Sequence, residues 1–582
     1  MQYIMDLITK LNGLLWGPWT LYGLLLAGIV FTIWTKFSQR TVLTHGVAVT
    51  RGKFDDPSDP GAINHFQALS AALSATIGLG NIGGVAIAIS IGGPGALFWM
   101  WVVGFLGMAL KTVEITMAMM YRDTSDPDDP HGGAMWVIDR TLGQRGGVAK
   151  IFARFAGSLF CITMLIMTMA GGNMFQTWNV ADLTLNYFGV PKVATGIVLA
   201  VVVGLVIIGG IKRIGRVAGR IVPLMCVLYL AAGLAVLAIN IQHLPGILLL
   251  VVKSAFSPVE ATGAFVGASA WLAFTWGLKR ALFSNEAGLG SAPIAHSAAK
   301  TNEPAREGVV GGMGPFIDTI CICTLTALVI LSTGAWNRGP TGELAGELQL
   351  ITNNGQTRFV APTSTDALPE LPPSDSWSVG STLFVVVDVP NPEGEGRVHK
   401  ELMGRVEGDE LGRPTTIAWD DAPAGADWIL GADGLPEKGV YKNYVGASLT
   451  SHAFDRAFPG LGKWLVTLAS WLFAISTMIS WSYYGEQGMI YLGGKRTVLP
   501  YKFVFLLLAV VGSVFVETTR ELGDMSDLGA GLMLWANMII VVIVGGAAVR
   551  CLGDYTERLK AGEFHFHGAK SVEEMVSGHD QE

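Results

Sequence analysis

A glycine-rich stretch inside an apolar segment is the part of this chain best suited to bind a small polar molecule. The stretch, Ser74–Ala88, reads SATIGLGNIGGVAIA and contains four glycines and Asn81. Glycine leaves backbone N–H and C=O groups uncovered and weakens a helix. Within hydrocarbon, such groups must be satisfied by the protein or line a cavity. The stretch therefore indicates a broken helix at a binding site, with close packing of helices through small residues as the alternative.

A second interrupted segment strengthens the first interpretation. Trp276–Pro293 reads WGLKRALFSNEAGLGSAP and carries several glycines in an otherwise apolar region. Two broken helices at matching places in the two halves of a chain are typical of the midplane site of a secondary transporter. We expect Trp276, Gly277 and Leu278 to form the unwound turn. Glu286 is expected to hold this break together by hydrogen bonding rather than to neutralise a cation.

The composition is that of a membrane protein. Of the 582 residues, 51% are hydrophobic and only 15% are charged, against about 25% charged in soluble proteins. Apolar runs of roughly 20 residues, long enough to span a bilayer, recur along most of the chain. This pattern predicts an all-α polytopic membrane protein rather than a β-barrel, which would show short alternating segments. The first apolar run, Trp16–Trp34, lacks a small-residue cleavage site and is expected to be a true span.

The apolar runs divide into a repeat. Window reading gives about eleven transmembrane helices, and their centres lie near Leu25, Gly80, Val103, Met167, Val202, Leu228, Phe274, Leu325, Phe473, Leu508 and Met538. The first span stands alone, and the next ten form two groups of five, each opened by a broken helix. Because each group has an odd number of spans, the two halves are inverted, as in the leucine-transporter type of fold.

The loop charges predict the orientation. Lys and Arg gather in alternate loops and after Arg550, whereas the loops between them nearly lack basic residues apart from Lys192, Lys253 and Arg520. Cytoplasmic loops carry the positive excess. We therefore expect the N-terminus outside, the C-terminus in the cytoplasm, and residues 337–463 outside.

Residues 337–463 differ in composition from the rest of the chain. They hold 18 acidic and 10 basic residues, a net charge of −8. Strand-like runs at Ser381–Val389 and Thr415–Trp419 predict a β-rich or partly irregular extracytoplasmic domain. A passive insertion on a tolerant loop is the favoured interpretation, and partner binding or gating is the alternative. The predicted organisation is a first membrane part (1–336), the acidic insertion (337–463), the last three membrane helices (464–551) and a cytoplasmic tail (552–582).

The sequence carries no pattern typical of an enzyme. No nucleotide-binding loop of the GxxxxGKS/T type, no His/Glu metal motif and no nucleophile–base pair is visible. The five cysteines lie in or beside apolar runs, which predicts buried core residues rather than disulfides or a metal site. The tail motif FHFHG (Phe564–Gly568) could bind metal weakly, but an exposed, solvated tail is the favoured interpretation.

Six segments distributed over nearly all the spans carry a common pattern. They are GLGNIGGVAIAISIGGPGALFWMWVVGFLGM (Gly78–Met108), GGNMFQTWNVAD (Gly171–Asp182), GGIKRIGRVAGRIVP (Gly209–Pro223), WGLKRALFSNEAGLGSAP (Trp276–Pro293), GPFIDTICICTLTALVIL (Gly314–Leu331) and FAISTMISWSYYGE (Phe473–Glu486). Together, and in this order, they resemble the alanine or glycine:cation symporter family, also called sodium:alanine symporters. The resemblance leaves out the 337–463 insertion.

The resemblance implies a sodium-coupled symporter that moves alanine or glycine into the cell by alternating access. It implies a multi-pass protein of the plasma membrane, the inner membrane of a bacterium. Na⁺ would be the coupling ion, with no organic cofactor, nucleotide or nucleic acid as a partner. Proton coupling stays open, as does an amino-acid-binding membrane sensor whose outer domain signals. A channel fits the resemblance less well.

The resemblance also implies the site residues. Free N–H groups at a half-helix suit a substrate carboxylate, and a hard cation takes carbonyl and hydroxyl oxygens. The implied substrate-binding residues are Thr76, Gly78, Gly80, Asn81, Gln176, Trp276, Gly277, Thr477 and Trp481, and the implied sodium ligands are Ser74, Ile77, Ser476 and Thr477.

For some of these residues a structural role competes with binding. Asn81 is about as well explained by a helix cap across the break. Hydroxyls in membrane helices commonly bond to their own backbone, which competes strongly for Ser480. The intramembrane acids Glu114 and Asp318 could couple protons, but a buried pair with Lys111 or with backbone donors is the favoured interpretation.

Overall fold

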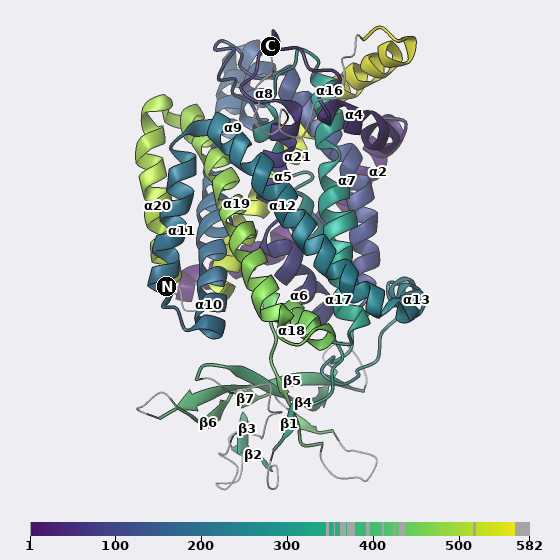
Figure 1. Cartoon of the computed structure of the whole chain (residues 1–582), viewed down its shortest axis with the longest axis vertical. Coiled ribbons are helices and arrows are strands. Elements are labelled where there is room, and N and C mark those ends of the chain that lie inside the picture. Colours follow the sequence, from purple (N-terminus) through teal and green to yellow (C-terminus); the bar gives the residue numbers. More distant parts are fainter. Residues whose placement is uncertain are drawn as a thin grey trace.

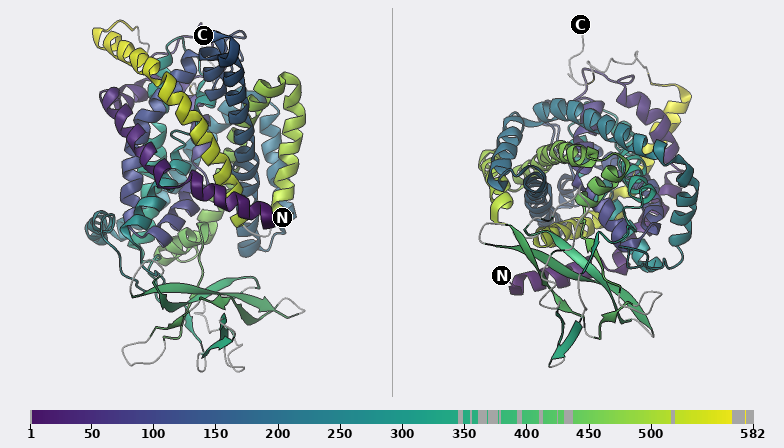
Figure 2. Two further views of the ribbon diagram at one scale, coloured as in Figure 1. Left: turned by 180° about the vertical axis from the view of Figure 1, so that it is seen from behind. Right: turned by 60° about the horizontal axis from the view of Figure 1, so that its bottom comes forward.

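A large helical body with a smaller β-sheet region at one end makes up the molecule, as the computed structural model shows (Figure 1). The sheets project from one end of the body, and the last turns of the final helix lie at the other end (Figures 1 and 2). The structure describes residues 2–344, 349–353, 356–360, 368, 377, 379–391, 396–409, 413–423, 425–429, 437–515, 519–564 and 575.

The helices follow the apolar runs. Those before residue 260 are α1 (Gln2–Leu15), α2 (Pro18–Trp34), α3 (Gln39–Thr41), α4 (Val47–Thr50), α5 (His65–Thr76), α6 (Val85–Gly92), α7 (Gly95–Met120), α8 (Ala134–Thr141), α9 (Gly147–Met169), α10 (Phe175–Phe188), α11 (Lys192–Ile207), α12 (Gly210–Ile239) and α13 (Leu244–Ser254). Those after it are α14 (Ala270–Asn285), α15 (Ala292–His296), α16 (Pro304–Gly311), α17 (Thr324–Ser332), α18 (Ala447–Ala457), α19 (Leu461–Gly493), α20 (Val498–Phe515) and α21 (Thr519–Ala561).

Turns of π-helix and 3₁₀-helix interrupt or flank these helices. The π-helical turns are η1 (Val42–Gly46), η2 (Gly80–Gly84), η4 (Ala170–Met174) and η6 (Phe316–Cys323), and the 3₁₀ turns are η3 (Gly143–Arg145), η5 (Ile241–His243) and η7 (Lys495–Thr497). Turns of the π type are frequent at functional sites, because the wider backbone frees polar groups and redirects side chains. One of them, η2, lies in the glycine-rich stretch Ser74–Ala88 that the sequence singled out.

The prediction of a polytopic helical membrane protein is confirmed. Within the described residues, seven helices are long and apolar enough to cross a membrane, and two bent pairs raise the number to nine. The two remaining predicted centres, Val202 and Phe274, lie in α11 and α14, which have 16 residues each. The count of about eleven spans and the leucine-transporter type of fold therefore stay predictions.

The first predicted break is present. Helix α5 starts at a capping box between Asn64 and Gln67, which satisfies its first free N–H groups. It ends at Thr76, and its axis bends by 52° to the helix that resumes at Gly80. Three residues, Ile77 to Leu79, thus separate the two half-helices in the middle of the body.

The second break is not where the sequence analysis put it. Trp276, Gly277 and Leu278 lie inside the continuous helix α14, and the interruption spans residues 286–291. Gly277 serves packing instead, since an added Cβ would lie 2.5 Å from the carbonyl oxygen of Ala96 in α7. The chain leaves the helix where positive φ angles occur, at Glu286 (55°), Gly288 (92°) and Gly290 (78°). These left-handed conformations, which favour glycine, terminate the helix.

The insertion is a β structure closed by a helix. Its strands are β1 (Gly342–Glu343), β2 (Gln349–Asn353), β3 (Gln356–Val360), β4 (Thr382–Pro390), β5 (Arg397–Gly408), β6 (Pro414–Trp419), β7 (Asp421–Ala422), β8 (Asp427–Trp428) and β9 (Gly439–Lys442). One antiparallel sheet has the order β1-β9-β4-β5-β6 with β8 beside β4, and another has the order β2-β3-β7. The two predicted strand runs correspond to β4 and β6. The last part of the predicted insertion is the helix α18.

Strand β4 explains how the larger sheet is held. Its alternating residues Leu383, Val385 and Val387 are fully buried in the sheet's own core. Phe384 points to the other face, where it stacks on Tyr441 at 5.3 Å and joins Ala264 from the loop before α14. The period of two in a strand lets one face build a core while the other docks on the helical body.

Two segments meet at the end of the body opposite the sheets. The backbone N–H of Ala62 donates to Ala298 O at 2.8 Å, and that of Lys300 donates to Ile63 O at 2.8 Å. The buried Arg122 clamps this junction by donating to four backbone carbonyls, those of Pro60, Ser297, Ala299 and Thr301. Burial lowers the pKa of Arg122 to about 10, so the guanidinium stays charged at neutral pH. It ties the entry of α5 to the exit of α15.

Replacing Arg122 with Leu should destabilise the folded protein by about 3 kcal/mol or more, because four carbonyls lose a charged donor. Arg122→Lys should not restore stability, since one ammonium group cannot reproduce the planar fork. The measurement is the midpoint of thermal unfolding of the purified chain in detergent. Arg145→Leu, at an exposed position in η3, is the control and should change stability by less than about 0.5 kcal/mol. Equal losses for the two leucine variants would contradict the clamp.

Candidate functional site

The end of α5 and the middle of α19 meet through serine. Ser74 Oγ donates to the carbonyl oxygen of Ser476 at 2.6 Å, and both residues are buried. Ser476 Oγ donates in turn to Phe473 O at 2.9 Å. Helix α5 ends at Thr76, and the backbone of the next residue, Ile77, is extended. Serine oxygens and helix-end carbonyls, all suitable ligands for a hard cation, therefore gather on both sides of one contact.

Two buried oxygens point at the first break without a partner. A Cβ built on Gly78 would lie 2.7 Å from Thr477 Oγ1 and 3.9 Å from Gln176 Oε1. Both oxygens are buried and accept no hydrogen bond within the described part of the chain. Gln176 is held in place by its Nε2, which donates to Gly171 O at 3.0 Å. Unsatisfied buried acceptors are costly, so a bound donor or cation is the natural occupant of this point.

Gly80 adds space beside these oxygens. An added Cβ would meet no atom within 4 Å, and the residue is half-buried. The next glycines of the stretch differ, because Gly83 is closed off by the backbone of Ala447 and Gly84 by the side chain of Arg280. The open side of the break is thus confined to its first turn.

An aromatic side chain, Trp481, lies one helical turn beyond Thr477 on the same face of α19. A Cβ on Gly172 would lie 2.5 Å from Trp481 Cβ, so the indole is seated directly on the π-helical turn η4. Trp481 is 2% exposed, and its ring meets Tyr484 edge-on at 5.3 Å. Ser480 Oγ, one residue before, has no hydrogen-bond partner within the described residues, against the expectation that it would bond to its own helix.

Asn81 spans the first break as a cap and also reaches the second broken helix. Its Oδ1 accepts from the backbone N–H of Gly78 at 2.9 Å. Its Nδ2 donates to Asp318 Oδ1 at 2.5 Å and to Ser284 Oγ at 3.1 Å. Ser284 Oγ donates to the other oxygen of the same carboxylate, and so does Thr319 Oγ1. The side chain of Asn81 is therefore fully engaged, as the alternative interpretation expected.

This network corrects the expectation for Asp318. The carboxylate binds amide and hydroxyl donors from η2, α14 and η6, and no ion pair with Lys111 is formed. Lys111 Nζ instead donates to Asn285 O at 2.6 Å. Sequence reasoning noticed Asp318 but missed Ser284 as its partner. The only signal was a serine just before the Asn285–Glu286 pair.

A second network fastens the second break. Glu286 Oε2 accepts from Ser291 Oγ at 2.6 Å, across the interrupted residues, as expected for a structural acid. The backbone N–H of Gly288 donates to Glu114 Oε2 at 3.0 Å. Asn537 of α21 donates to Gly288 O at 2.8 Å and to the other oxygen of Glu114. The loop is thus anchored to α7 and α21.

Other predicted site residues lie apart from this point. Gly277 packs on α7, and Thr76 Oγ1 donates back to Leu73 O at 3.2 Å. Trp276 lies under Lys279, whose Nζ is 5.8 Å from the ring centroid, and no described contact joins it to Gln176 or Thr477. The FHFHG motif lies, after Phe564, outside the described residues. Among those described, no group of three or more His, Cys, Asp or Glu could hold a metal ion.

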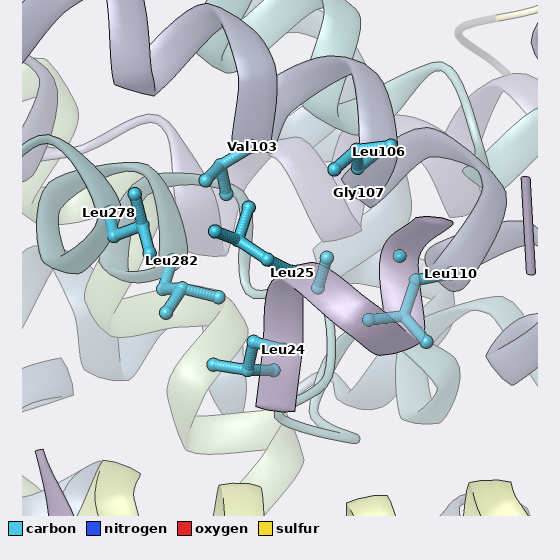
Figure 3. A pocket seen from close by; sticks show the side chains of 10 residues that line it. Leu24, Leu25, Val103, Leu106, Gly107, Leu110, Leu278 and Leu282 are labelled. Atoms are coloured by element: carbon cyan, nitrogen blue, oxygen red, sulfur yellow. The ribbon is translucent and has the colours of Figure 1, made fainter. Parts of the chain in front are cut away.

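An apolar crevice lies elsewhere, between α2, α7 and α14 (Figure 3). Its lining is almost entirely aliphatic: Leu24, Leu25, Gly28, Val103, Leu106, Gly107, Leu110, Leu278, Leu282 and Ala287. None of the predicted binding residues lines it. The crevice offers no polar group to orient an amino acid, so we assign it no part in the site.

Known proteins resemble the chain over most of its length. Residues 1–361 and 429–568 match the sequence profile of the sodium:alanine symporter family, and most of the insertion falls between them. The sodium/alanine symporter AgcS of Methanococcus maripaludis is 34% identical over 544 residues, covering 94% of this chain and 95% of that protein.

Two Bacillus subtilis proteins are each 30% identical. One is the putative sodium/proton-dependent alanine carrier protein YrbD, matched over 96% of this chain and 93% of its own. The other is the probable sodium/glutamine symporter GlnT, matched over 97% of this chain and 93% of its own.

Asn81→Ala should lower the free energy of unfolding by about 3 kcal/mol, because the buried Asp318 carboxylate and the Gly78 N–H each lose a partner. Thermal unfolding in detergent measures the change. Asn179→Ala is the matched control, since within the described residues that amide donates to Phe175 O of its own helix at 2.7 Å, and it should cost less than about 1 kcal/mol. If both variants unfold at the same temperature, Asn81 does not hold the break.

Proposed function

Because the chain belongs to the sodium:alanine symporter family, we propose that it carries a small neutral amino acid, alanine or glycine, into the cell together with Na⁺. The family and its several membrane-spanning helices make it a multi-pass transporter. The family membership is shown by the comparisons, whereas the substrate, the coupling ion and the direction of transport are proposed. The observation that carries it is the pair of unpaired buried oxygens, Thr477 Oγ1 and Gln176 Oε1, aimed at the break beside Gly78.

The sodium site is proposed where α5 and α19 touch. Ser74 Oγ already contacts Ser476 O at 2.6 Å, and the carbonyl of Ile77 lies at the helix end. With Thr477 Oγ1 these groups supply neutral oxygens, which suit a hard monovalent cation. None of the four residues carries an acid that could take up a proton in place of the ion, and this favours Na⁺ over H⁺ as the coupling ion.

The amino acid is proposed to bind at the open turn between Gly78 and Gly80. Backbone N–H groups at the start of the second half-helix favour its carboxylate. Its ammonium group is a donor for Gln176 Oε1, which has none among the described residues. Trp481, seated on Gly172, closes the far side. A short side chain is preferred because the indole has no room to retreat towards η4.

Coupling follows from a shared residue. Thr477 faces both the proposed ion site and the substrate side of Gly78, so sodium would fix the hydroxyl that the substrate then meets. Sodium must raise the affinity for the amino acid, and the amino acid must raise the affinity for sodium by the same factor. If this site is exposed alternately to the two sides of the membrane, sodium and the amino acid cross the membrane together.

Uptake of labelled alanine into proteoliposomes of the purified chain tests the function. An inward Na⁺ gradient should concentrate alanine inside, and an equal K⁺ gradient should not. Glycine in excess should compete. Equal uptake in both gradients would contradict sodium coupling and point to protons or facilitated diffusion. Binding of alanine without uptake would point to a sensor instead.

Thr477→Ala should raise the Na⁺ concentration for half-maximal uptake by about tenfold, since one lost oxygen ligand is worth about 1.4 kcal/mol. Gln176→Ala should mainly raise the alanine concentration for half-maximal uptake and leave the sodium curve within about twofold. The sodium dependence of uptake is measured for both variants in parallel, so each variant serves as the control for the other. Identical sodium curves would refute the role of Thr477.

A further inference from the structure

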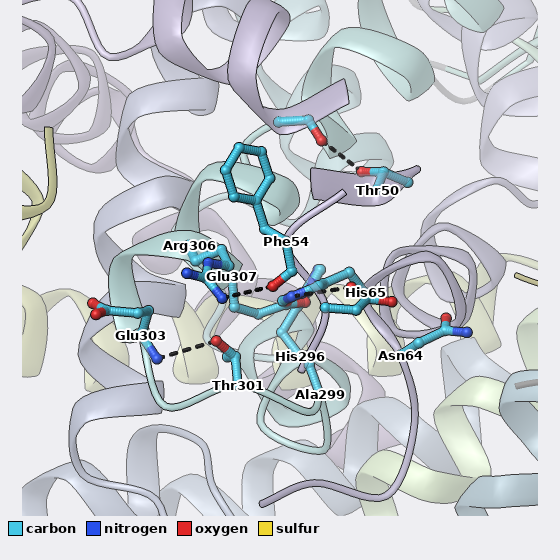
Figure 4. A network of polar contacts seen from close by, with 12 residues as sticks. Thr50, Phe54, Asn64, His65, His296, Ala299, Thr301, Glu303, Arg306 and Glu307 are labelled. Atoms are coloured by element: carbon cyan, nitrogen blue, oxygen red, sulfur yellow. Dashed lines mark hydrogen bonds and ion pairs between the residues drawn. The ribbon is translucent and has the colours of Figure 1, made fainter. Parts of the chain in front are cut away.

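A buried His–Glu–His cluster joins the outer ends of the two broken helices (Figure 4). It lies at the end of the helical body opposite the sheets, near the labels of α4 and α16 in Figure 1. His65 is the first residue of α5, His296 is the last of α15, and Glu307 lies in α16. His65 Nδ1 contacts Glu307 Oε2, and His296 Nδ1 lies 2.5 Å from Glu307 Oε1. All three side chains are at most 1% exposed. We call these three residues the histidine latch.

We propose that the histidine latch is a proton-binding site, which holds one proton while the two helix ends are together and releases it when they separate. The inference rests on the proposed transport function, because it assigns the latch to the opening of this end. It adds a ligand, the proton, at a place distant from the proposed sodium and amino-acid site.

The hydrogen-bonding pattern calls for this proton. A neutral imidazole that donates from Nδ1 to Glu307 presents only a lone pair at Nε2. Both Nε2 atoms of the latch are buried and lack a hydrogen-bond partner in the described part of the chain. What His65 Nε2 faces is an acceptor, Asp55 Oδ1, at 3.8 Å. An imidazolium at His65 would place an N–H before each carboxylate.

His296 is the less suitable of the two rings. Its Nε2 lies beside the backbone of Gly311, where an added Cβ would come within 3.0 Å. The carboxylate that it touches is the one it shares with His65. We therefore place the exchanged proton on His65 and leave His296 as a neutral donor that orients Glu307.

The other charged groups near the latch are committed elsewhere. Arg122 binds four carbonyls, and Arg306 donates to Phe54 O at 2.8 Å and to Tyr555. Burial, helped by Arg306 and His65, lowers the pKa of His45 to about 4, so that ring stays neutral.

The two longer helices that pack on α5, α12 and α19, place no buried, unpaired charged side chain beside the latch within the described residues. On α12 the basic residues are all exposed: Lys212, Arg213, Arg216 and Arg220. On α19, Glu486 pairs with Lys502 at 2.8 Å. Among the described residues, Glu307 and Asp55 are the charged groups in direct contact with the latch imidazoles.

Opening this end must break the latch. The residues before α5 and after α15 are also paired through their backbones and bound by Arg122. The backbone pairing, the Arg122 hydrogen bonds and the latch contacts must therefore break at the same time. Separation would admit water to the imidazole and the carboxylate, and the proton would pass to the compartment that this end faces, the cytoplasm in the predicted orientation. Imidazole exchanges protons between pH 5 and 8. An acid interior should therefore keep the latch closed.

The first test is sodium-driven alanine uptake at a series of internal pH values from 5.5 to 8, with the external pH fixed. For the wild-type chain the initial rate should fall on internal acidification, by at most about tenfold per pH unit for one proton. His65→Gln should flatten the profile to within about twofold over the range. The control His243→Gln, in η5 near the other end, should keep the wild-type profile. A His65→Gln profile equal to that of the wild type would overturn the proposal.

A second measurement decides the latch even if no transport is found. The midpoint of thermal unfolding is followed from pH 8 to 5.5 in detergent, without sodium or amino acid. Because unfolding separates His65 from Glu307 and Asp55 and so removes the proposed proton site, the wild type should gain stability over His65→Gln as the pH falls. Glu307→Gln, which keeps the shape but removes the charge, should lose the same gain and serves if His65→Gln folds poorly. Parallel pH profiles of all three would overturn the latch, whereas absent uptake alone would refute only the proposed function.

Discussion

Burial of polar groups without water is the constraint on which this structure depends. A break in a helix at the middle of a membrane protein exposes backbone groups that hydrocarbon cannot satisfy. The two breaks differ in how their polar groups are hydrogen-bonded. At the second break Glu114 and Asn537 bind the backbone of Gly288, and Ser291 binds the side chain of Glu286, so the loop is fastened. At the first break Asn81 satisfies one N–H, but Thr477 and Gln176 still present unpaired oxygens. The first break is therefore the one suited to a ligand.

The Asn81–Asp318–Ser284 network gives the two broken helices a common centre. One carboxylate collects donors from η2, α14 and η6, so a rearrangement of either broken helix changes the surroundings of the other. Buried polar networks act as units, in which removal of one member leaves the rest unsatisfied. The network thus joins the half-helix that resumes after the first break to the helix that precedes the second break.

The sequence predicted correctly those elements whose formation depends on residues close together in the chain. The first break followed from Gly78 and Gly80, and β4 and β6 followed from short strand-like runs separated by turn clusters. The contact between Ser74 and Ser476 is present as expected, although its role as an ion site stays a prediction. The second break was misplaced because a glycine in a helix can serve packing, as Gly277 does, while positive φ at Glu286 has no sequence signature. The partners of Asp318 were missed because Asn81 lies 237 residues away along the chain.

The seam between the insertion and the helical body has a mechanical consequence. Helix α18 follows the last strand directly, and its start leaves no room over Gly83, where a Cβ would lie 2.9 Å from Ala447 N. Thr450 Oγ1 also donates to Ile82 O at 3.0 Å. Because α18 follows β9 after residues 443–446, a tilt of η2 towards α18 would displace β9, and with it β4 and β1, the strands that pair with β9. The insertion is therefore mechanically continuous with the first break, so a force applied to the sheet would also act on the half-helix that begins at Gly80.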